Sequence, residues 1–348
     1  MKRALDDTAP RELAIGVDLG GTHVLAVLVD VHGHVHARKE AKIGEDSRGS
    51  QETVGQALST CLVEVWRHAR DHFAACLPLK GVGIAVPGNV DPRRGMTRYL
   101  PNFGWLEPVN LAALVLDRTA EPESATRSVR DLLGVDELHM RNDGRCAALA
   151  ERHFGVAKDG KHDVMAMLTL GTGIGGALVH GGGLFDGCTF DAGDFGHHVI
   201  CSGADAFQCV CGKSGCFECH ASAAGLVRHW RALGGDAHIS LDDARSVIQL
   251  MRDGNSTALT AFRRCRTDLA TGLANLVSFY NPSLIVLGGG LSRTPELYDG
   301  LQDRVDSQTL PATRGTFSIV QSTLGADCVA MGAGWLVFDE CAKPKAAK

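Results

Sequence analysis

Residues 13–30 read LAIGVDLGGTHVLAVLVD, and this stretch decides the fold of the chain. A short apolar run ends at Asp18, Gly20-Gly21-Thr22 interrupts it, and a β-branched pattern resumes at Val24. Two such runs on either side of a glycine segment predict a β-hairpin. Residues 31–34, VHGH, turn the chain into a third expected strand. The protein therefore opens with a β-meander and not with the strand-to-helix step of a dinucleotide-binding fold.

A second version of this hairpin lies near the middle of the chain. Residues 165–170 are apolar, residues 171–176 read GTGIGG, and residues 177–180 resume the apolar run. Between the two hairpins, apolar side chains recur at helical spacing from residue 54 to 69, and residues 81–87 read as a buried strand. The repeat of strand, glycine turn and strand predicts a duplicated α/β fold.

The last third of the chain adds a long helix and another strand. Residues 259–280 form an amphipathic helical pattern, which Asn281-Pro282 ends. Residues 284–287 then form an apolar strand that leads directly into Gly288-Gly289-Gly290. A third glycine segment is thus expected at a strand end.

Composition limits the class of protein. The chain has 348 residues, of which 45% are hydrophobic and 22% charged, so it can bury a large core and is long enough for two domains. A net charge of -5 and a pI near 6.3 provide no broad basic surface, and we expect no nucleic-acid partner. The longest apolar runs have only strand length, so we expect no membrane partner.

The twelve cysteines resemble a disulfide framework in number but not in placement. Half of them fall between Cys188 and Cys219, and the N-terminal MKRALDDTAP lacks an apolar signal core. We therefore expect reduced thiols and a cytoplasmic protein.

Residues 194–218 hold one imidazole and three thiols at metal-ligand spacing. The stretch DFGH at 194–197 is followed by CVCGKSGCFE at 209–218. A closed set of nitrogen and sulfur donors is typical of structural zinc and leaves no position for a substrate, which predicts Zn²⁺ on His197, Cys209, Cys211 and Cys216. Such a site would tether the loop and hold Asp194 near Glu218. Four neighbouring residues that we interpret as bystanders are Cys201, Cys219, His198 and His220.

The glycine turns suit phosphate binding. Backbone N–H groups can converge on anionic oxygens where no side chain obstructs the approach. Residues 20–22 and 171–173 fit this requirement, and each turn adds a threonine hydroxyl. One such turn is an ordinary hairpin feature, but two matched turns in duplicated units favour a shared function.

Two aspartates lie at expected strand ends. Asp18 could hold Mg²⁺ through water beside the phosphates, or could simply cap the turn. Asp143 follows Asn142 after an expected strand at residues 138–140, at an edge where such sheets bind ligands. Taken alone, Asp143 is better explained as a helix N-cap.

Together these residues resemble the signatures of the ROK family of sugar kinases and sugar-responsive repressors. The resemblance extends from about Ile15 to Trp335. It implies an actin-like, ribonuclease-H-like ATPase fold of the α/β class, with two domains, ATP in the cleft between them and a hexose beneath its terminal phosphate. The motifs, in chain order, are DLGGT (18–22), PGNVD (87–91), PNFGW (101–105), Asn142-Asp143, LGTGIGG (170–176), the His/Cys cluster and VLGGG (286–290).

The resemblance also implies a division of the chain. We expect a small N-terminal α/β domain over residues 1–135, with a C-terminal helix at about 329–348 packing back on it. A large α/β domain over residues 136–328 would carry the zinc site. The polar stretch at residues 119–133 is the expected linker or surface insertion.

Site residues follow from the same resemblance. It implies that Asp143 is the general base, and that the sugar contacts are Gly88, Asn102, Asn142, Asp143, Asp194, His197 and Glu218. It implies that ATP and Mg²⁺ are bound by Asp18, Gly20, Gly21, Thr22, Gly171, Thr172 and Gly173. Gly288, Gly289 and Gly290 would lie against the adenosine, and the assembly would be a homodimer or homotetramer.

The chain departs from the family at two positions of interest. Asp194 stands where Glu is usual, so a sugar contact there would be lost, bridged by water or directed at a different sugar. His23 stands where Lys is common, and we expect little consequence because it lies near solvent. The alternating His32, His34 and His36 are interpreted as a solvated hairpin face.

The favoured function is an ATP-dependent kinase that phosphorylates the 6-hydroxyl of a hexose, with glucose first. N-acetylglucosamine, N-acetylmannosamine and fructose are rival substrates. A sugar-sensing repressor is an alternative, but only about twelve residues precede the first strand, too few for a helix-turn-helix. A pseudokinase is a further alternative, against which the intact Asp18, Asp143 and glycine turns argue.

Overall fold

The computed structural model describes residues 12–44, 49–100, 103–120 and 127–342. The chain divides into two compact units, one formed by Met1–Lys158 with Leu324–Lys348 and the other by Asp159–Thr323. We call them unit 1 and unit 2.

Unit 1 is built on a five-stranded sheet in the order β3-β2-β1-β4-β8. Its strands are β1 (Leu13–Leu19), β2 (His23–Asp30), β3 (Val35–Lys42), β4 (Val82–Val86) and β8 (Leu138–Asn142). A three-stranded sheet adds β5 (Asn89–Asp91), β6 (Met96–Tyr99) and β7 (Val109–Asn110). The α-helices are α1 (Gln51–His72), α2 (Leu111–Leu116), α3 (Val129–Leu133), α4 (Asp143–His153) and α10 (Cys328–Ala342).

Unit 2 repeats the sheet topology of unit 1. Its five-stranded sheet has the order β11-β10-β9-β12-β13. In both sheets the hairpin strands pair antiparallel and the two later strands pair parallel, which confirms the predicted duplication. The strands are β9 (Val164–Leu170), β10 (Ile174–His180), β11 (Gly183–Leu184), β12 (Leu284–Gly288) and β13 (Ser318–Gln321). The α-helices are α5 (Phe217–Ala221), α6 (Ala223–Ala232), α7 (Ala244–Arg252), α8 (Ser256–Tyr280) and α9 (Leu301–Ser307).

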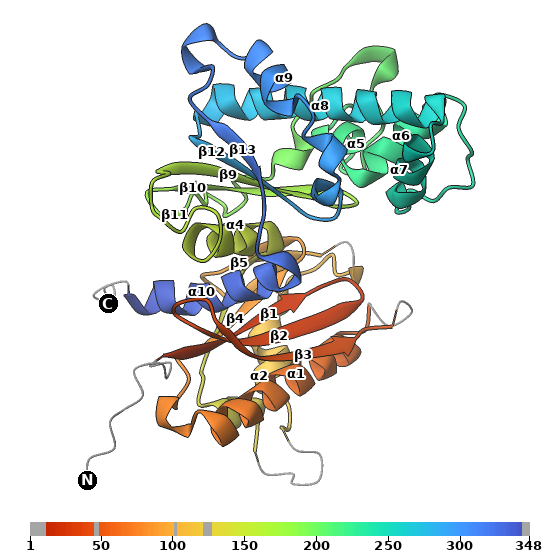
Figure 1. Cartoon of the computed structure of the whole chain (residues 1–348). Helices are drawn as coiled ribbons and strands as arrows, with labels where there is room; N and C mark the ends of the chain where they lie inside the picture. The colour runs from red at the N-terminus through yellow and green to blue at the C-terminus, as the bar shows by residue number, and fades with distance from the viewer. Residues whose placement is uncertain (1–11, 45–48, 101–102, 121–126, 343–348) are drawn as a thin grey trace. The chain divides into compact units, whose positions relative to one another are not determined.

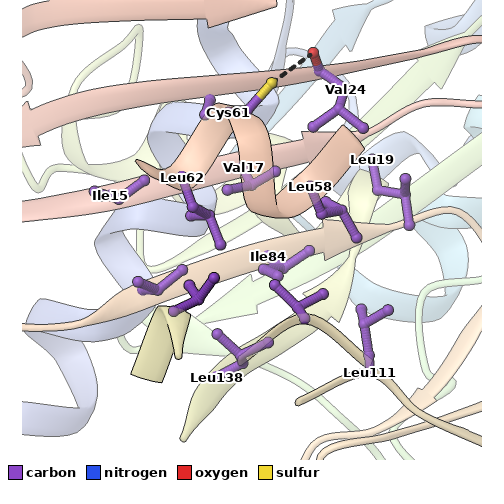
Figure 2. Close-up of a cluster of buried hydrophobic side chains, with 14 of the residues drawn as sticks. Ile15, Val17, Leu19, Val24, Leu58, Cys61, Leu62, Ile84, Leu111 and Leu138 are labelled. Atoms are coloured by element: carbon purple, nitrogen blue, oxygen red, sulfur yellow. Dashed lines mark hydrogen bonds between the residues drawn. The ribbon is translucent and has the colours of Figure 1, made fainter. Parts of the chain in front are cut away.

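Alternation along β1 explains why both faces of the unit 1 sheet are covered. Ile15, Val17 and Leu19 belong to one buried cluster with Leu58 and other side chains of α1, as Figure 2 shows. The thiol of Cys61 lies 3.9 Å from the carbonyl oxygen of Val24 in this cluster. Fully burying each large aliphatic side chain contributes about 1.5–3 kcal/mol, so the cluster fixes α1 on this face.

The opposite face of the same sheet receives the C-terminal helix. Gly16 of β1 and Gly83 of β4 leave no room for a Cβ atom, because the carbonyl oxygens of Ala330 and Ala333 in α10 approach their backbones. Helix and sheet pack this closely only because both strand positions lack a side chain. Figure 1 shows α10 beside β1 and β4, although it is the last helix of the chain.

The division of the chain differs from the expected boundary near residue 135. Strand β8 pairs parallel with β4, and helix α4 packs against α10, where Gly332 has no room for a Cβ atom against the carbonyl of Cys146. These contacts place residues 136–158 in unit 1 and end unit 2 at Thr323. Asp143 therefore belongs to unit 1, because parallel pairing joins its strand to a partner about fifty residues earlier.

The histidines of the first meander surround a carboxylate. Nδ1 of His34 lies 3.1 Å and Nε2 of His36 lies 3.0 Å from Oδ2 of Asp30, which is nearly buried. The backbone N–H groups of His32 and His34 donate to Oδ1 of the same residue. His32 and His34 are exposed as expected, while His36 is partly buried, and all three lie around Asp30 at the hairpin turn. Among the helices described, none is both long and apolar enough to cross a bilayer.

Candidate active site

Three parallel strands end at one edge of the unit 1 sheet. Asp18 of β1 is in register with Ala85 of β4, and Val86 of β4 is in register with Asn142 of β8. Because the carboxyl ends of parallel strands meet at one edge, this register brings Asp18 and Asp143 into electrostatic contact. The structure thus gathers both predicted acids at a strand-end site.

Burial raises the pKa of both acids. Burial, with the nearby Asp143 carboxylate as a second cause, raises the pKa of Asp18 from 3.8 to about 7. Burial also raises the pKa of Asp143, although the N–H of Gly144 and the charge of Arg145 oppose the shift. Such perturbed carboxyl groups are typical of sites that bind cations or accept protons.

Asp143 is the first residue of α4 and is not its N-cap. Asn142 occupies the cap, and its Oδ1 accepts the N–H of Gly144 at 3.0 Å. Oδ1 of Asp143 accepts the same N–H at 2.8 Å, so the carboxylate sits at the positive end of the helix. Asn142, and not Asp143, is therefore the N-cap of this helix.

Gly88 and Asn142 are joined by a hydrogen bond. Nδ2 of Asn142 donates to the carbonyl oxygen of Gly88 at 3.2 Å, which fixes the amide beside Asp143. Gly88 has φ +124°, and a Cβ atom there would lie 2.5 Å from the carbonyl oxygen of Tyr99, so the position requires glycine. Asn102, the other predicted amide contact, lies outside the described residues.

The first glycine turn exposes its backbone. The N–H of Gly20 donates to the carbonyl of His23 at 2.9 Å, which closes the turn between β1 and β2. A Cβ atom at Gly21 would have no neighbour within 4 Å, and Thr22 is exposed. A ligand can therefore approach the backbone of this turn directly, beside Asp18 at the strand end.

The second glycine turn opens onto a pocket in unit 2. Gly171, Thr172 and Gly290 line a pocket of about 440 Å³, so the structure brings the second and third predicted glycine segments together. A Cβ atom on Gly289, which has φ +84°, would lie 2.6 Å from the carbonyl oxygen of Leu170. Gly288 pairs with Thr169 at the end of β12, so the strands place both turns at one sheet edge.

The start of helix α6 is hydrogen-bonded to the second glycine turn. The hydroxyl of Ser222 donates to the carbonyl of Thr172 at 2.7 Å, and the N–H of Ala223 donates to the carbonyl of Gly171 at 2.9 Å. The pocket has further walls that sequence reasoning missed, namely Ala223, Asp242, Asp243, Ala244, Arg245, Ile248 and Leu291. The sequence around Asp243 signals a helix start, but nothing in it links that start to a glycine turn some seventy residues earlier.

Gly173 lies against Glu218 and is not among the residues that line this pocket. A Cβ atom on Gly173 would be 2.5 Å from Oε2 of Glu218. The same oxygen accepts the N–H of Ile174 at 3.4 Å. One hairpin turn therefore serves two neighbouring places, with Gly171 and Thr172 on the pocket and Gly173 beside the carboxylate.

The predicted metal ligands converge in unit 2. The donor atoms of His197, Cys209, Cys211 and Cys216 all lie within 4.8 Å of one another. Nδ1 of His197 is 3.7 Å from Sγ of Cys209, and the sulfurs of Cys211 and Cys216 are 3.5 Å apart. One imidazole and three thiols in this arrangement fit a tetrahedral zinc ion, for which they are the preferred donors.

Local turns hold these ligands in place. The short 3₁₀ helix Phe195–His197 carries His197, and the exposed Asp194 directly precedes it. The N–H of Cys209 donates to the carbonyl of Lys213 at 2.8 Å, which closes the turn that contains Cys211. The ammonium of Lys213 in turn donates to the carbonyl of His197 at 2.7 Å. The loop is thus closed on itself around the ligand set.

The residues interpreted as bystanders differ in how close they lie to the four predicted ligands. Cys219 forms an overlapping group with Cys209 and Glu218, next to the four predicted ligands. His220 belongs to a different cluster, with His229 and Asp268. His198 packs against the ring of Phe217 and its Nδ1 lies 2.6 Å from the carbonyl oxygen of Phe195.

The chain is similar to known proteins over most of its length. Residues 14–340 match the ROK family. The glucokinase of Thermotoga maritima is 30% identical over 94% of this chain and 98% of its own length. The N-acetyl-D-glucosamine kinase of Erwinia tasmaniensis is 29% identical over 86% of this chain and 91% of its length. The crystal structure of a ROK family glucokinase from Streptomyces griseus in complex with glucose and AMPPNP matches with a TM-score of 0.71 at 26% identity, covering 94% of this chain and 99% of that one.

Proposed function

The chain belongs to the ROK family, and we propose that it is a glucokinase, an ATP-dependent kinase that transfers the γ-phosphate of ATP to the 6-hydroxyl of glucose. Its fold is the duplicated, actin-like ATPase fold of the ROK sugar kinases. Among the relatives that match most of this chain are a glucokinase and an N-acetyl-D-glucosamine kinase. The chain is thus an ATP-dependent sugar kinase.

The observation that carries this proposal is the carboxylate of Asp143 at the strand-end site. In the proposed reaction an oxygen of Asp143 accepts the proton of the sugar hydroxyl while the oxygen of that hydroxyl attacks the γ-phosphorus. The new O–P bond forms as the bond to the leaving ADP oxygen breaks. Because burial raises the pKa of Asp143, the carboxylate has more affinity for this proton than an exposed aspartate would have.

The nucleotide is assigned to the glycine turns. Gly171, Thr172 and Gly290 line one pocket, which supports the assignment of the phosphates to the second turn and of the adenosine to the segment 288–290. Gly20, Gly21 and Thr22 of the first turn would supply backbone N–H groups and a hydroxyl to the terminal phosphates. Asp18 would hold Mg²⁺, which neutralises phosphate charge when it is bound.

The sugar is assigned to amide and carboxylate side chains of both units, those beside Asp143 in unit 1 and those beside the metal cluster in unit 2. Each hexose hydroxyl can both donate and accept a hydrogen bond. Carboxylates accept hydrogen bonds and amides both donate and accept them, so together they can bind the hydroxyls in defined directions. Of the proposed contacts, Gly88 and Asn142 are held together in unit 1. Nδ1 of His197 lies 3.6 Å from Oε1 of Glu218 in unit 2, and Asp194 directly precedes the short helix that carries His197. Asn102 is the remaining proposed contact.

Zinc is proposed to be structural. His197, Cys209, Cys211 and Cys216 would hold the ion, which supplies a cross-link and no reacting group because the four protein donors fill its coordination. The cross-link would fix Glu218, whose carboxylate lies next to two of these donors. Nε2 of His197 would remain available to a sugar hydroxyl, since Nδ1 faces the sulfurs.

A second substrate class has specific support. The N-acetylglucosamine kinase that is 29% identical to this chain makes N-acetylhexosamines the rival acceptors, and Asp194 is the position where the contact differs from the family's usual Glu. We further propose that the protein is cytoplasmic and forms a homodimer or homotetramer.

A panel of acceptors tests the proposal. Purified protein with zinc, MgCl₂ and ATP is assayed for ADP release with glucose, mannose, fructose, N-acetylglucosamine and N-acetylmannosamine. The proposed function requires the highest kcat/KM with glucose and formation of glucose 6-phosphate. A higher kcat/KM with an N-acetylhexosamine would show that this sugar, and not glucose, is the substrate. Sugar binding without ADP release for any acceptor would show that the protein is a sugar-sensing regulator or a pseudokinase.

A further inference from the structure

A second pocket of about 590 Å³ lies in unit 2 and shares no lining residue with the glycine-turn pocket. Its size is typical of sites for small molecules. Helices α5, α6 and α8 pack against one another (Figure 1). They supply most of the residues that line this pocket. The lining residues used below are Asp205, Phe207, His220, His229, Arg263, Arg264 and Asp268.

A carboxylate held by two histidines forms one wall of this pocket. Oδ2 of Asp268 lies 2.9 Å from Nε2 of His229 and 3.4 Å from Nδ1 of His220. Both histidines are buried, whereas about 28% of the Asp268 side chain is exposed. Both rings contact Oδ2, so within the described residues Oδ1 of Asp268 has no partner. A fixed and ionised acceptor therefore faces the pocket.

Two arginines lie one helical turn away from this carboxylate. Arg264 precedes Asp268 by four residues on α8, and Arg263, five residues before Asp268, also lines the pocket. Both are exposed, and neither forms an ion pair in the part of the chain that the structure describes. One turn corresponds to about 5.4 Å along the axis, so the guanidinium groups and the carboxylate can contact opposite ends of one small molecule.

A metal ion fits this cluster poorly. The donor atoms of His220, His229 and Asp268 lie within 4.8 Å of one another. However, the N–H of Phe207 donates to Nε2 of His220 at 3.2 Å, so the ring proton of neutral His220 is on Nδ1. A protonated Nδ1 has no lone pair for a metal, and the two nearby guanidinium groups repel a dication.

We propose that this pocket binds a small phosphorylated polyol of the hexose phosphate class. The phosphate would bind Arg263 and Arg264, whose guanidinium groups donate in pairs to phosphate oxygens. A hydroxyl of the polyol would donate to Oδ1 of Asp268. Asp205 also lines the pocket, and its negative charge repels a phosphate group. The phosphate is therefore expected beside the arginines and not beside Asp205. The proposal depends on this lining and not on the proposed kinase reaction.

The test uses glucose 6-phosphate as the probe, titrated calorimetrically into the full-length, zinc-loaded protein that is saturated with glucose and AMPPNP. Saturation removes binding at the proposed active site, and the remaining binding event reports the second pocket. The double variant Arg263→Ala with Arg264→Ala should weaken it by about tenfold or more, since two charged hydrogen-bond donors are lost. Both arginines are exposed, so the variant should fold. Arg314→Ala, another exposed arginine of unit 2, is the matched control and should change affinity less than about twofold.

Asp268→Asn separates the two ends of the ligand. It should weaken glucose 6-phosphate binding while leaving binding of inorganic phosphate unchanged, and if it fails to fold the arginine variant decides alone. Three results would overturn the proposal: no binding of glucose 6-phosphate to the saturated protein, unchanged binding in the arginine variant, or a second equivalent of Zn²⁺ or Ni²⁺ whose binding needs His229 but not the arginines. If the unaltered protein has no kinase activity but still binds glucose 6-phosphate in this pocket, the result would count against the proposed function alone.

Discussion

Oε1 of Glu218 lies 3.6 Å from Nδ1 of His197. The same oxygen lies 3.4 Å from Sγ of Cys209, so a carboxylate proposed to bind the sugar touches two proposed zinc ligands. Its other oxygen packs against Gly173 of the second glycine turn. The metal cluster, the proposed sugar carboxylate and the second glycine turn are therefore in direct contact, so loss of the metal should alter the position of Glu218.

Removal of the metal should lower both stability and sugar affinity. Cys211→Ser deletes one donor and should lower the free energy of unfolding by at least about 2 kcal/mol, because the ligand loop loses its cross-link. Glucose affinity should fall with it. Thermal melting, zinc content and glucose calorimetry are the measurements. Cys188→Ser, at an exposed free cysteine, is the control, and unchanged melting with unchanged affinity in Cys211→Ser would remove zinc as the support of Glu218.

Glu218→Gln should weaken the sugar and spare the metal. Gln keeps the size of the side chain and loses the charge, and a charged hydrogen bond is worth about 1.5–3 kcal/mol, so KM for glucose should rise about 10- to 100-fold. Zinc content should stay at one ion per chain. Glu137→Gln, at an exposed position of unit 1, is the control. An unchanged KM would contradict the assignment of Glu218 to the sugar.

Asp143→Asn should abolish phosphoryl transfer without abolishing sugar binding. The amide cannot accept the hydroxyl proton, and loss of a general base lowers kcat by about 10²- to 10⁴-fold. Coupled assays give kcat, and calorimetry with glucose should still show binding. Exposed Asp136→Asn, on the same unit, should behave as the unaltered protein. Near-normal turnover of Asp143→Asn would show that another group takes the proton.

Asp194→Glu should change the choice of sugar. Glu is one methylene longer than Asp and is the residue usual in the family at this position. A gained or lost charged hydrogen bond changes relative kcat/KM by about one to two orders of magnitude. The acceptor panel applied to both proteins measures the ratio between glucose and N-acetylglucosamine. The same ratio in both would show that residue 194 does not set specificity.

Asp18 should make the ligand-free protein less stable as pH rises. Its pKa is about 7 in the folded chain and 3.8 ordinarily, so between these values the folded state keeps a proton that the unfolded state has lost. Stability from this group is present below pH 3.8 and is lost as pH rises through 7, by up to about 1.4 kcal/mol per pH unit.

Asp18→Asn should remove this loss, because the amide does not ionise. The variant should melt at a higher temperature than the unaltered protein at pH 8, and the two should converge near pH 4, while kinase activity with Mg²⁺ and ATP falls. Melting curves across this range, recorded without nucleotide, are the measurement. Parallel curves for the two proteins would show that Asp18 is ionised in the folded state throughout.

The local sequence pattern was enough to predict the strands of both hairpins and the cluster of possible metal ligands. The strands around Gly20-Gly21-Thr22 and their repeat around Gly171 follow from alternation and glycine placement, which depend on neighbours in the chain. The convergence of four possible metal ligands was predictable because their spacing along one loop is itself the signal. Asp143 was placed at a strand end for the same local reason.

Long-range contacts decided the rest. The end of unit 1 at Lys158 depends on the pairing of β8 with β4, and the pocket at Gly171 depends on α7 and Gly290. The contact of Glu218 with His197 and the second pocket along α8 arise where separate elements pack. The sequence by itself determined which chemical groups this protein has, whereas the tertiary structure decided which of them meet, because pairing between distant segments leaves no periodic mark on either segment.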